Sequence, residues 1–144
     1  MDSLGNHQCY TEKFMRPLRF STIWLTLGFL LVALVIYFSI IRNPPSAFHF
    51  SNSDKLTHLL VYFSVMLWFG MIFLPGKTYF ILGLGLVMMG ILLEFIQGAT
   101  PYRSMEVLDM LSNTLGVLLG GLLARTPVSA FLVILESKVP KQLT

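Results

Sequence analysis

The stretch TIWLTLGFLLVALVIYFSII, residues 22–41, contains 20 residues and no charged side chain. A helix needs about 20 apolar residues to cross the roughly 30 Å hydrocarbon core of a bilayer. Three further apolar segments follow at 56–74, 78–96 and 107–124, each 18 or 19 residues long. We therefore expect an all-α membrane protein in which these segments form a four-transmembrane-helix bundle, spanning residues 22–124.

The first apolar segment has a competing interpretation as a cleavable signal peptide. Its apolar stretch is longer than the roughly 7 to 15 residues of a signal sequence. The following RNPPS, residues 42–46, is not a small-residue cleavage site. We therefore expect this segment to be retained as a membrane span.

The composition supports one membrane-embedded domain. Of the 144 residues, 12% are charged and 55% are hydrophobic, whereas a soluble domain carries about 25% charged residues. The net charge of +3 comes from basic residues that flank the apolar segments, so nucleic acid is not an expected partner. The single cysteine, Cys9, cannot form an internal disulfide.

Basic residues predict the orientation, because cytoplasmic loops of membrane proteins carry an excess of Lys and Arg. Seven of them lie on the side of the two termini and three on the other side. The seven are Lys13, Arg16, Arg19, Lys77, Arg125, Lys138 and Lys141, and the three are Arg42, Lys55 and Arg103. We expect both termini to be cytoplasmic, with tails at 1–21 and 125–144.

Two short segments between and after the spans are informative. PGK, residues 75–77, is so short that the second and third spans must be antiparallel neighbours. The C-terminal tail contains PVSAFLVILE, residues 127–136, which is apolar but too short to span. This segment either lies along the inner membrane surface or caps the bundle, and the sequence leaves both open.

The polar side chains of the spans are expected to meet at the outer membrane face, because successive spans run in opposite directions. They are Asp54, Lys55 and His58 in the second span, Glu94 and Gln97 at the end of the third, Arg103 in the outer turn, and Asp109 and Asn113 in the fourth. Ionisable groups within membrane helices are costly and mark functional sites when they face a bundle interior. We therefore predict one charged pocket that opens to the outer surface.

Helical spacing supports this convergence. Asp54, His58 and Tyr62 are four residues apart and share a helix face. Glycines, which let helix backbones approach closely, continue the polar stripes of the third and fourth spans; they are Gly83, Gly90, Gly116 and Gly120. A structural interpretation is also open, in which Asp54 only caps its helix and Gln97 and Asn113 only link helices.

Three blocks carry these residues: SDKLTHLLVYF at 53–63, LLEFIQG at 92–98 and YRSMEVLDMLSNTLGVLLGG at 102–121. Together they resemble the pattern of the VanZ-like family of bacterial membrane proteins. The matching positions are Asp54, Lys55, His58, Tyr62, Glu94, Gln97, Arg103, Ser104, Asp109, Asn113 and Gly116. The resemblance implies a multi-pass protein of the bacterial cytoplasmic membrane with a cell-envelope role. The family takes its name from a protein associated with low-level resistance to the glycopeptide teicoplanin, and the resemblance supplies no reaction.

The first functional hypothesis is binding of an envelope lipid or cell-wall precursor head group. Lys55 and Arg103 would be anion clamps, since Arg offers a planar fork of donors to phosphate or carboxylate. Tyr62, Gln97, Ser104 and Asn113 would complete the binding site together with Asp54. The expected partners are membrane lipids and a lipid-linked cell-wall precursor, and a homo-oligomer remains open.

Two other hypotheses come from different classes. An enzyme, a hydrolase or transferase acting on a lipid-linked phosphate, would use His58 with Glu94 and Asp109 for acid–base catalysis. A proton-coupled lipid transporter would use the same groups as a relay, but the inner halves of the spans are apolar. A divalent metal ion held by Asp54, His58, Glu94 and Asp109 is chemically possible. Their spacing fits no standard ligand motif, so the sequence predicts neither a metal ion nor another cofactor.

Overall fold

The computed structural model describes residues 14–42 and 53–140, and within these ranges the chain is built of helices without a named strand. The helices are α2 (Ser21–Ile40), α3 (Ser53–Ile72), α4 (Lys77–Gly98), α5 (Val107–Leu123), the 3₁₀-helix η1 (Pro127–Ala130) and α6 (Phe131–Ser137). The extended pairing described is a single isolated bridge between Met15 and Phe73. The predicted tail residues Cys9, Lys13 and Lys141 lie outside the described residues.

Three helices are long and apolar enough to cross a membrane. They are α2 and α3, with 20 residues each, and α4, with 22. Helix α5 has 17 residues and meets the same criterion only together with the η1–α6 segment, from which it is bent by 75°. The described chain therefore has three candidate spans, or four when the bent pair is counted, and these lengths are compatible with a multi-pass membrane protein.

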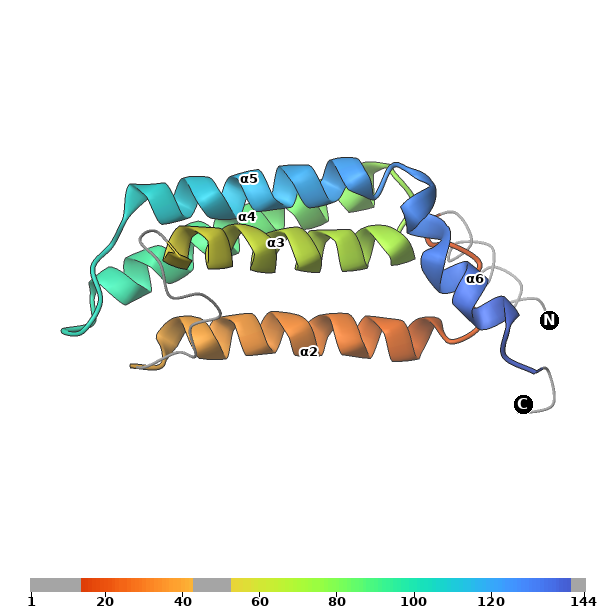
Figure 1. Cartoon of the computed structure of the whole chain (residues 1–144), viewed down its shortest axis with the longest axis horizontal. Coiled ribbons are helices and arrows are strands. Elements are labelled where there is room, and N and C mark those ends of the chain that lie inside the picture. The colour runs from red at the N-terminus through yellow and green to blue at the C-terminus, as the bar shows by residue number, and fades with distance from the viewer. Residues whose placement is uncertain (1–13, 43–52, 141–144) are drawn as a thin grey trace, which may run out of the picture.

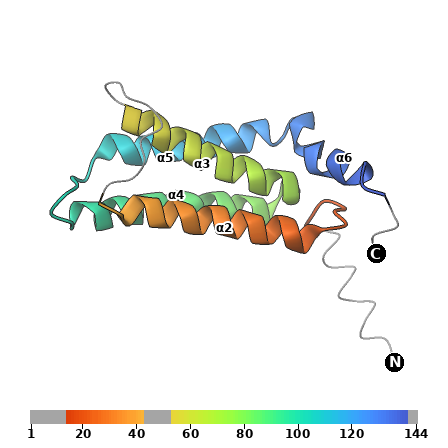
Figure 2. The ribbon, with the colours of Figure 1, turned by 60° about the horizontal axis from the view of Figure 1, so that its bottom comes forward.

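The long helices lie side by side, as Figure 1 shows. Helix α3 packs most extensively on α5, and α5 packs on α4. Helix α2 completes the arrangement by contacting both α3 and α4, and Figure 2 shows it running alongside α4. Most side chains of α2 are exposed when no bilayer surrounds the protein, as expected for a helix that faces lipid over much of its surface.

Glycines explain why α3 and α5 approach so closely. A Cβ atom at Gly116 would overlap the carbonyl oxygen of Leu59, and one at Gly120 would overlap that of Phe63. The two backbones therefore touch at positions four residues apart along each helix, which is the small-xxx-small mode of membrane helix packing. Because no side chain separates them, the relative position of α3 and α5 is fixed by the main chain.

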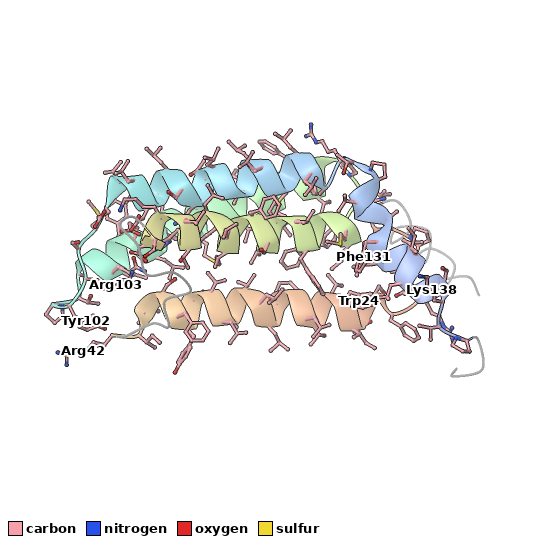
Figure 3. All side chains as sticks on the ribbon, in the orientation of Figure 1. Trp24, Arg42, Tyr102, Arg103, Phe131 and Lys138 are labelled. Atoms are coloured by element: carbon pink, nitrogen blue, oxygen red, sulfur yellow. The ribbon has the colours of Figure 1, made fainter. Side chains whose placement is uncertain are left out.

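The helices present two chemically distinct ends. We call "the polar end" the one formed by the starts of α3 and α5 and the ends of α2 and α4, and "the opposite end" the one with the start of α2 and with α6 (Figure 1). Figure 3 places Arg42, Tyr102 and Arg103 at the polar end and Trp24 and Lys138 at the opposite end.

At the opposite end, α6 is attached to the start of α2. The carboxylate of Glu136 accepts hydrogen bonds from the backbone N–H of Arg19 at 2.5 Å, the backbone N–H of Phe20 at 2.9 Å and Nε1 of Trp24 at 2.7 Å. Helix α2 has no side-chain cap of its own at Phe20, and Glu136 accepts from the two backbone N–H groups just before its first residue, as the glutamate of a capping box does for the N-cap N–H. Leu132 of α6 is buried in the hydrophobic core. The C-terminal apolar segment therefore covers this end of the helices.

Candidate functional site

The polar end brings together most of the side chains that the sequence singles out. Helix α3 supplies Asp54, Lys55 and His58 from its first two turns, and α5 supplies Asp109 and Asn113 from the same end. Helix α4 runs in the other direction and supplies Glu94 and Gln97 from its last turns, while Arg103 lies in the α4–α5 turn. These positions follow from helix direction and length.

His58 lies at the centre of this cluster and contacts both α5 and its own helix. Its Nδ1 is 3.0 Å from Oδ1 of Asn113, and because an amide oxygen only accepts, Nδ1 carries the hydrogen. Its other nitrogen, Nε2, faces Asp54 Oδ1 and Asp109 Oδ2, each at 3.9 Å. These two distances are too long for hydrogen bonds. The imidazole is thus oriented by Asn113, and Nε2 points between two carboxylates.

Lys55 forms ion pairs on the side of the cluster that faces α5. Its ammonium donates a hydrogen bond to Glu106 Oε2 at 2.7 Å and lies 3.5 Å from Asp109 Oδ1. Glu106, just before α5, is exposed, and the hydrogen bond from Lys55 lowers the pKa of the Glu106 carboxyl below its usual value. Lys55 therefore has two carboxylate neighbours within the protein.

Two carboxylates of the cluster are buried. Glu94 is 1% exposed, and it accepts a hydrogen bond from the backbone N–H of Glu106 at 2.8 Å. Asp109 is 3% exposed, and its Oδ1 is enclosed without accepting any hydrogen bond. A buried carboxylate without hydrogen bonds is costly. Asp109, whose Oδ1 has Lys55 at 3.5 Å but accepts no hydrogen bond, is therefore less completely satisfied than Glu94.

The end of α2 is tied to the polar end by hydrogen bonds to its carbonyl groups. Gln97 Nε2 donates to the carbonyl oxygen of Ser39 at 2.8 Å, and the hydroxyl of Tyr102 donates to that of Ile40 at 3.1 Å. These carbonyls belong to the last turn of α2, where intrahelical partners are lacking. Gln97 is therefore a link between helices, in agreement with the structural interpretation that the sequence left open.

A cavity of about 450 Å³ lies between α2 and α3 and reaches the polar end. Its polar side chains include Asp54, His58, Gln97 and Arg103. The remainder of the lining is mainly apolar and comes from Leu31, Leu34, Val35 and Phe38 of α2 and Leu60, Val61 and Val65 of α3. Leu34, Phe38 and Leu60 are exposed, so the cavity is open along its side.

Arg103 is the cationic side chain of the cavity lining. Its Nη2 is 3.4 Å from Asp54 Oδ2, which is a long contact with a carboxylate that is itself 55% exposed. Since a guanidinium has five N–H donors, this contact leaves most of its donors available to a ligand. A phosphate or carboxylate group in the cavity could therefore bind Arg103 in a bidentate manner.

The predicted site residues divide into two layers. Asp54, His58, Tyr62, Gln97 and Arg103 line the cavity. Behind them, toward α4 and α5, lie Lys55, Glu94, Asp109 and Asn113, which do not line it. Ser104 is exposed in the α4–α5 turn and is also outside the lining.

Sequence reasoning did not single out two parts of this site. The first is Glu106, whose carboxylate binds Lys55 and whose N–H binds Glu94; its position three residues before Asp109 was the available signal. The second is the apolar lining from α2, which carries no pattern because the whole helix is apolar. Comparison of the chain with known protein families, with characterised proteins and with solved structures gives no match.

Proposed function

We propose that this chain is a VanZ-like integral membrane protein that binds the head group of an envelope lipid or of a lipid-linked cell-wall precursor. In this proposal α2, α3, α4 and α5 form a four-transmembrane-helix bundle in the bacterial cytoplasmic membrane, with both termini in the cytoplasm and the polar end outside. Binding of the precursor would contribute to tolerance of glycopeptides such as teicoplanin. The observation that carries the proposal is the amphipathic cavity between α2 and α3.

The shape of the cavity suits an amphiphile. The lining on α3 runs from Ser53 to Val65, a length of about 18 Å at 1.5 Å per residue. On α2 it runs from Ser39 back to Leu31, about 12 Å by the same measure. A hydrocarbon chain can follow this apolar surface while its head group stays at the polar end.

The head group must supply most of the net affinity. Lipid tails are as apolar as the side chains of membrane helices, so moving a chain from the bilayer into the cavity changes its surroundings little. A head-group phosphate that gains a bidentate contact with Arg103 gains a charge-assisted hydrogen bond pair, which is stronger than neutral contacts. Since Lys55 is paired with Glu106, the clamp in this proposal is Arg103.

A second candidate function is an enzyme acting on a lipid-linked phosphate. The observation in its favour is that His58 lines the cavity and that its Nε2 lies near two carboxylates, which suits general acid–base catalysis. A proton-coupled transporter has less support, because the part of the cavity away from the polar end is lined by apolar side chains. Release of phosphate or transfer of a head group by the purified protein would favour the enzyme.

The binding proposal is tested by lipid mass spectrometry of the protein purified in a mild detergent. We expect a co-purifying anionic lipid or polyprenyl-phosphate species in the wild type. In Arg103→Ala the amount of this lipid should fall at least tenfold, because the variant loses one pair of charge-assisted hydrogen bonds. Arg125→Ala is the matched control, because Arg125 is exposed and lies beyond the end of α5, away from the cavity. Equal lipid content in the wild type and Arg103→Ala would contradict the proposal.

A further inference from the structure

Three side chains at the polar end direct donor atoms at one another. One ligand atom from each of Asp54, His58 and Asp109 lies within 4.8 Å of the other two. Nε2 of His58 is 3.9 Å from Asp54 Oδ1 and 3.9 Å from Asp109 Oδ2. Atoms that bind one metal ion at 2.0 to 2.2 Å lie about 3 to 4 Å from each other, so the three atoms need little movement to share an ion.

The atoms that face one another here are all electron-rich, so a positive charge between them would be stabilised. Because Nδ1 of His58 carries the hydrogen that Asn113 accepts, a neutral imidazole directs the lone pair of Nε2 toward two carboxylate oxygens. Three electron-rich atoms then face one another. Even with a proton on Nε2, the nitrogen lies 3.9 Å from either oxygen, beyond hydrogen-bond length. A divalent cation satisfies all three atoms together.

Each of the three side chains is held from its other side. Asn113 binds Nδ1 of His58 at 3.0 Å, Arg103 lies 3.4 Å from Oδ2 of Asp54, and Lys55 lies 3.5 Å from Oδ1 of Asp109. In every case the contact uses the atom that does not face the shared space. Metal sites have this organisation, in which outer partners orient the ligands and fix the histidine tautomer.

Asp109 provides an independent indication. Its side chain is 5% exposed, its Oδ1 is enclosed and accepts no hydrogen bond, and its Oδ2 faces His58. Buried charges are usually paired, hydrogen-bonded or coordinated to a metal. The nearest cation, Lys55, is shared with Glu106, to which it lies closer. Asp109 is therefore paired with Lys55 through Oδ1 at 3.5 Å, while its Oδ2 faces the proposed ion with His58 Nε2 at 3.9 Å as its neighbour.

We infer that Asp54, His58 and Asp109 form a binding site for a divalent transition-metal ion, with mixed nitrogen and oxygen ligands of the kind that suit Zn²⁺ or Mn²⁺. Asp54 and His58 also line the cavity, so a remaining coordination position faces it. A phosphate oxygen of a bound head group can occupy that position beside Arg103. This last step depends on the proposed function, whereas the metal site itself does not.

The metal site is tested on the full-length protein in detergent, first by metal analysis after purification and then by titration of the chelator-treated protein with Zn²⁺ and Mn²⁺. We expect about one ion per chain in the wild type and at least a tenfold weaker affinity in His58→Ala and Asp109→Asn. Tyr102→Phe is the control at the same end: its hydroxyl donates to the carbonyl of Ile40, and it is not one of the three ligands. X-ray absorption of the Zn²⁺-loaded wild type should show nitrogen and oxygen ligands at about 2.0 to 2.2 Å, and this measurement does not depend on the folding of a variant.

The outcomes separate the metal site from the lipid proposal. Arg103→Ala should lose the lipid and keep the ion, because Arg103 contacts the exposed oxygen of Asp54 only at 3.4 Å. Metal binding without any co-purifying lipid would contradict the proposed function and support the metal site. A wild-type protein that binds neither ion, an absorption spectrum without a nitrogen ligand, or equal weakening in Tyr102→Phe would overturn the metal site.

Discussion

Two carboxylates buried at the two ends of the helices have very different surroundings. Glu136, at the opposite end, accepts three hydrogen bonds from N–H groups at the start of α2. Asp109, at the polar end, has an enclosed oxygen that lies 3.5 Å from Lys55 without accepting a hydrogen bond, and a second oxygen 3.9 Å from a histidine nitrogen. The first arrangement is complete and holds two segments of the chain together. The second is incomplete, and an incomplete buried charge is the feature that indicates a ligand.

The largest expected effect breaks the complete arrangement. Glu136→Ala leaves three N–H groups at the start of α2 without their acceptor. Unsatisfied buried donors cost roughly 1 to 3 kcal/mol each, less when water can reach them, so the free energy of unfolding should fall by about 2 to 4 kcal/mol. Thermal or denaturant unfolding in detergent measures this change. Glu136→Gln retains one acceptor oxygen and should lose less; equal losses in the two variants would contradict the hydrogen-bond explanation.

The incomplete arrangement should respond to metal. Adding Zn²⁺ or Mn²⁺ at 100 times its dissociation constant should stabilise the chelator-treated wild type by about 2.7 kcal/mol. Asp109→Asn should gain at most about 1.4 kcal/mol at the same concentration, because it removes one ligand oxygen and a tenfold weaker affinity leaves about that much stabilisation. Without metal this variant should be close to the wild type in stability, since it removes a buried charge that is costly to desolvate and Lys55 keeps Glu106 as a partner at 2.7 Å. Melting curves with and without metal check both statements, and an equal metal response in Asp109→Asn and the wild type would exclude Asp109 as a ligand.

A smaller effect concerns the link between the polar end and α2. Gln97→Met keeps the approximate side-chain size but removes the hydrogen bond to the carbonyl of Ser39. Hydrogen bonds between membrane helices contribute about 0.6 kcal/mol on average, so the loss of stability should be of that order. We expect faster hydrogen exchange in the last turn of α2 and unchanged exchange in α3. Faster exchange in both helices would mean that Gln97 supports the whole polar end.

The smallest effect is expected for the exposed link beside it. The hydroxyl of Tyr102 donates to Ile40 at 3.1 Å on the surface, where water can replace it. Tyr102→Phe should therefore change stability by less than about 0.5 kcal/mol, and lipid and metal content should equal those of the wild type. A marked loss of either ligand in this variant would place Tyr102 in the site.

The helical nature of the chain was predictable from the sequence for a simple physical reason. In lipid, backbone polar groups must be satisfied internally, so a long apolar segment such as 22–41 has few alternatives to a helix. Alternating helix directions then also brought Asp54, Glu94 and Asp109 to one end. The prediction that the chain is helical is confirmed, and three or four of its helices are long and apolar enough to span a membrane; the four-helix bundle and the orientation in the membrane stay predictions.

The atomic relations within the site could not be predicted. Sequence spacing assigns Lys55 to the cluster, but it does not show that the Lys55 ammonium donates a hydrogen bond to Glu106 at 2.7 Å. The sequence also does not show which residues of α2 line the cavity, because α2 is apolar on every side and has no polar stripe to mark one face. Glu136 reaches Phe20 across 116 positions of the chain, and only the folded arrangement brings such distant residues into contact.

The backbone contact between Leu59 and Gly116 has a wider consequence. Leu59 is one residue from His58, and Gly116 is three residues from Asn113. The close backbone contact between α3 and α5, which we call the seam, therefore sets the distance between these two side chains. Because they are already held in place, little entropy is lost when a ligand binds. Helix α2, which provides the other side of the cavity, is bound less tightly and makes no such seam. Substitutions along α2 can therefore widen or lengthen the cavity while the charged side chains of α3 and α5 keep their positions. Under the proposed function, one scaffold of this kind can be adapted to amphiphiles with different tails.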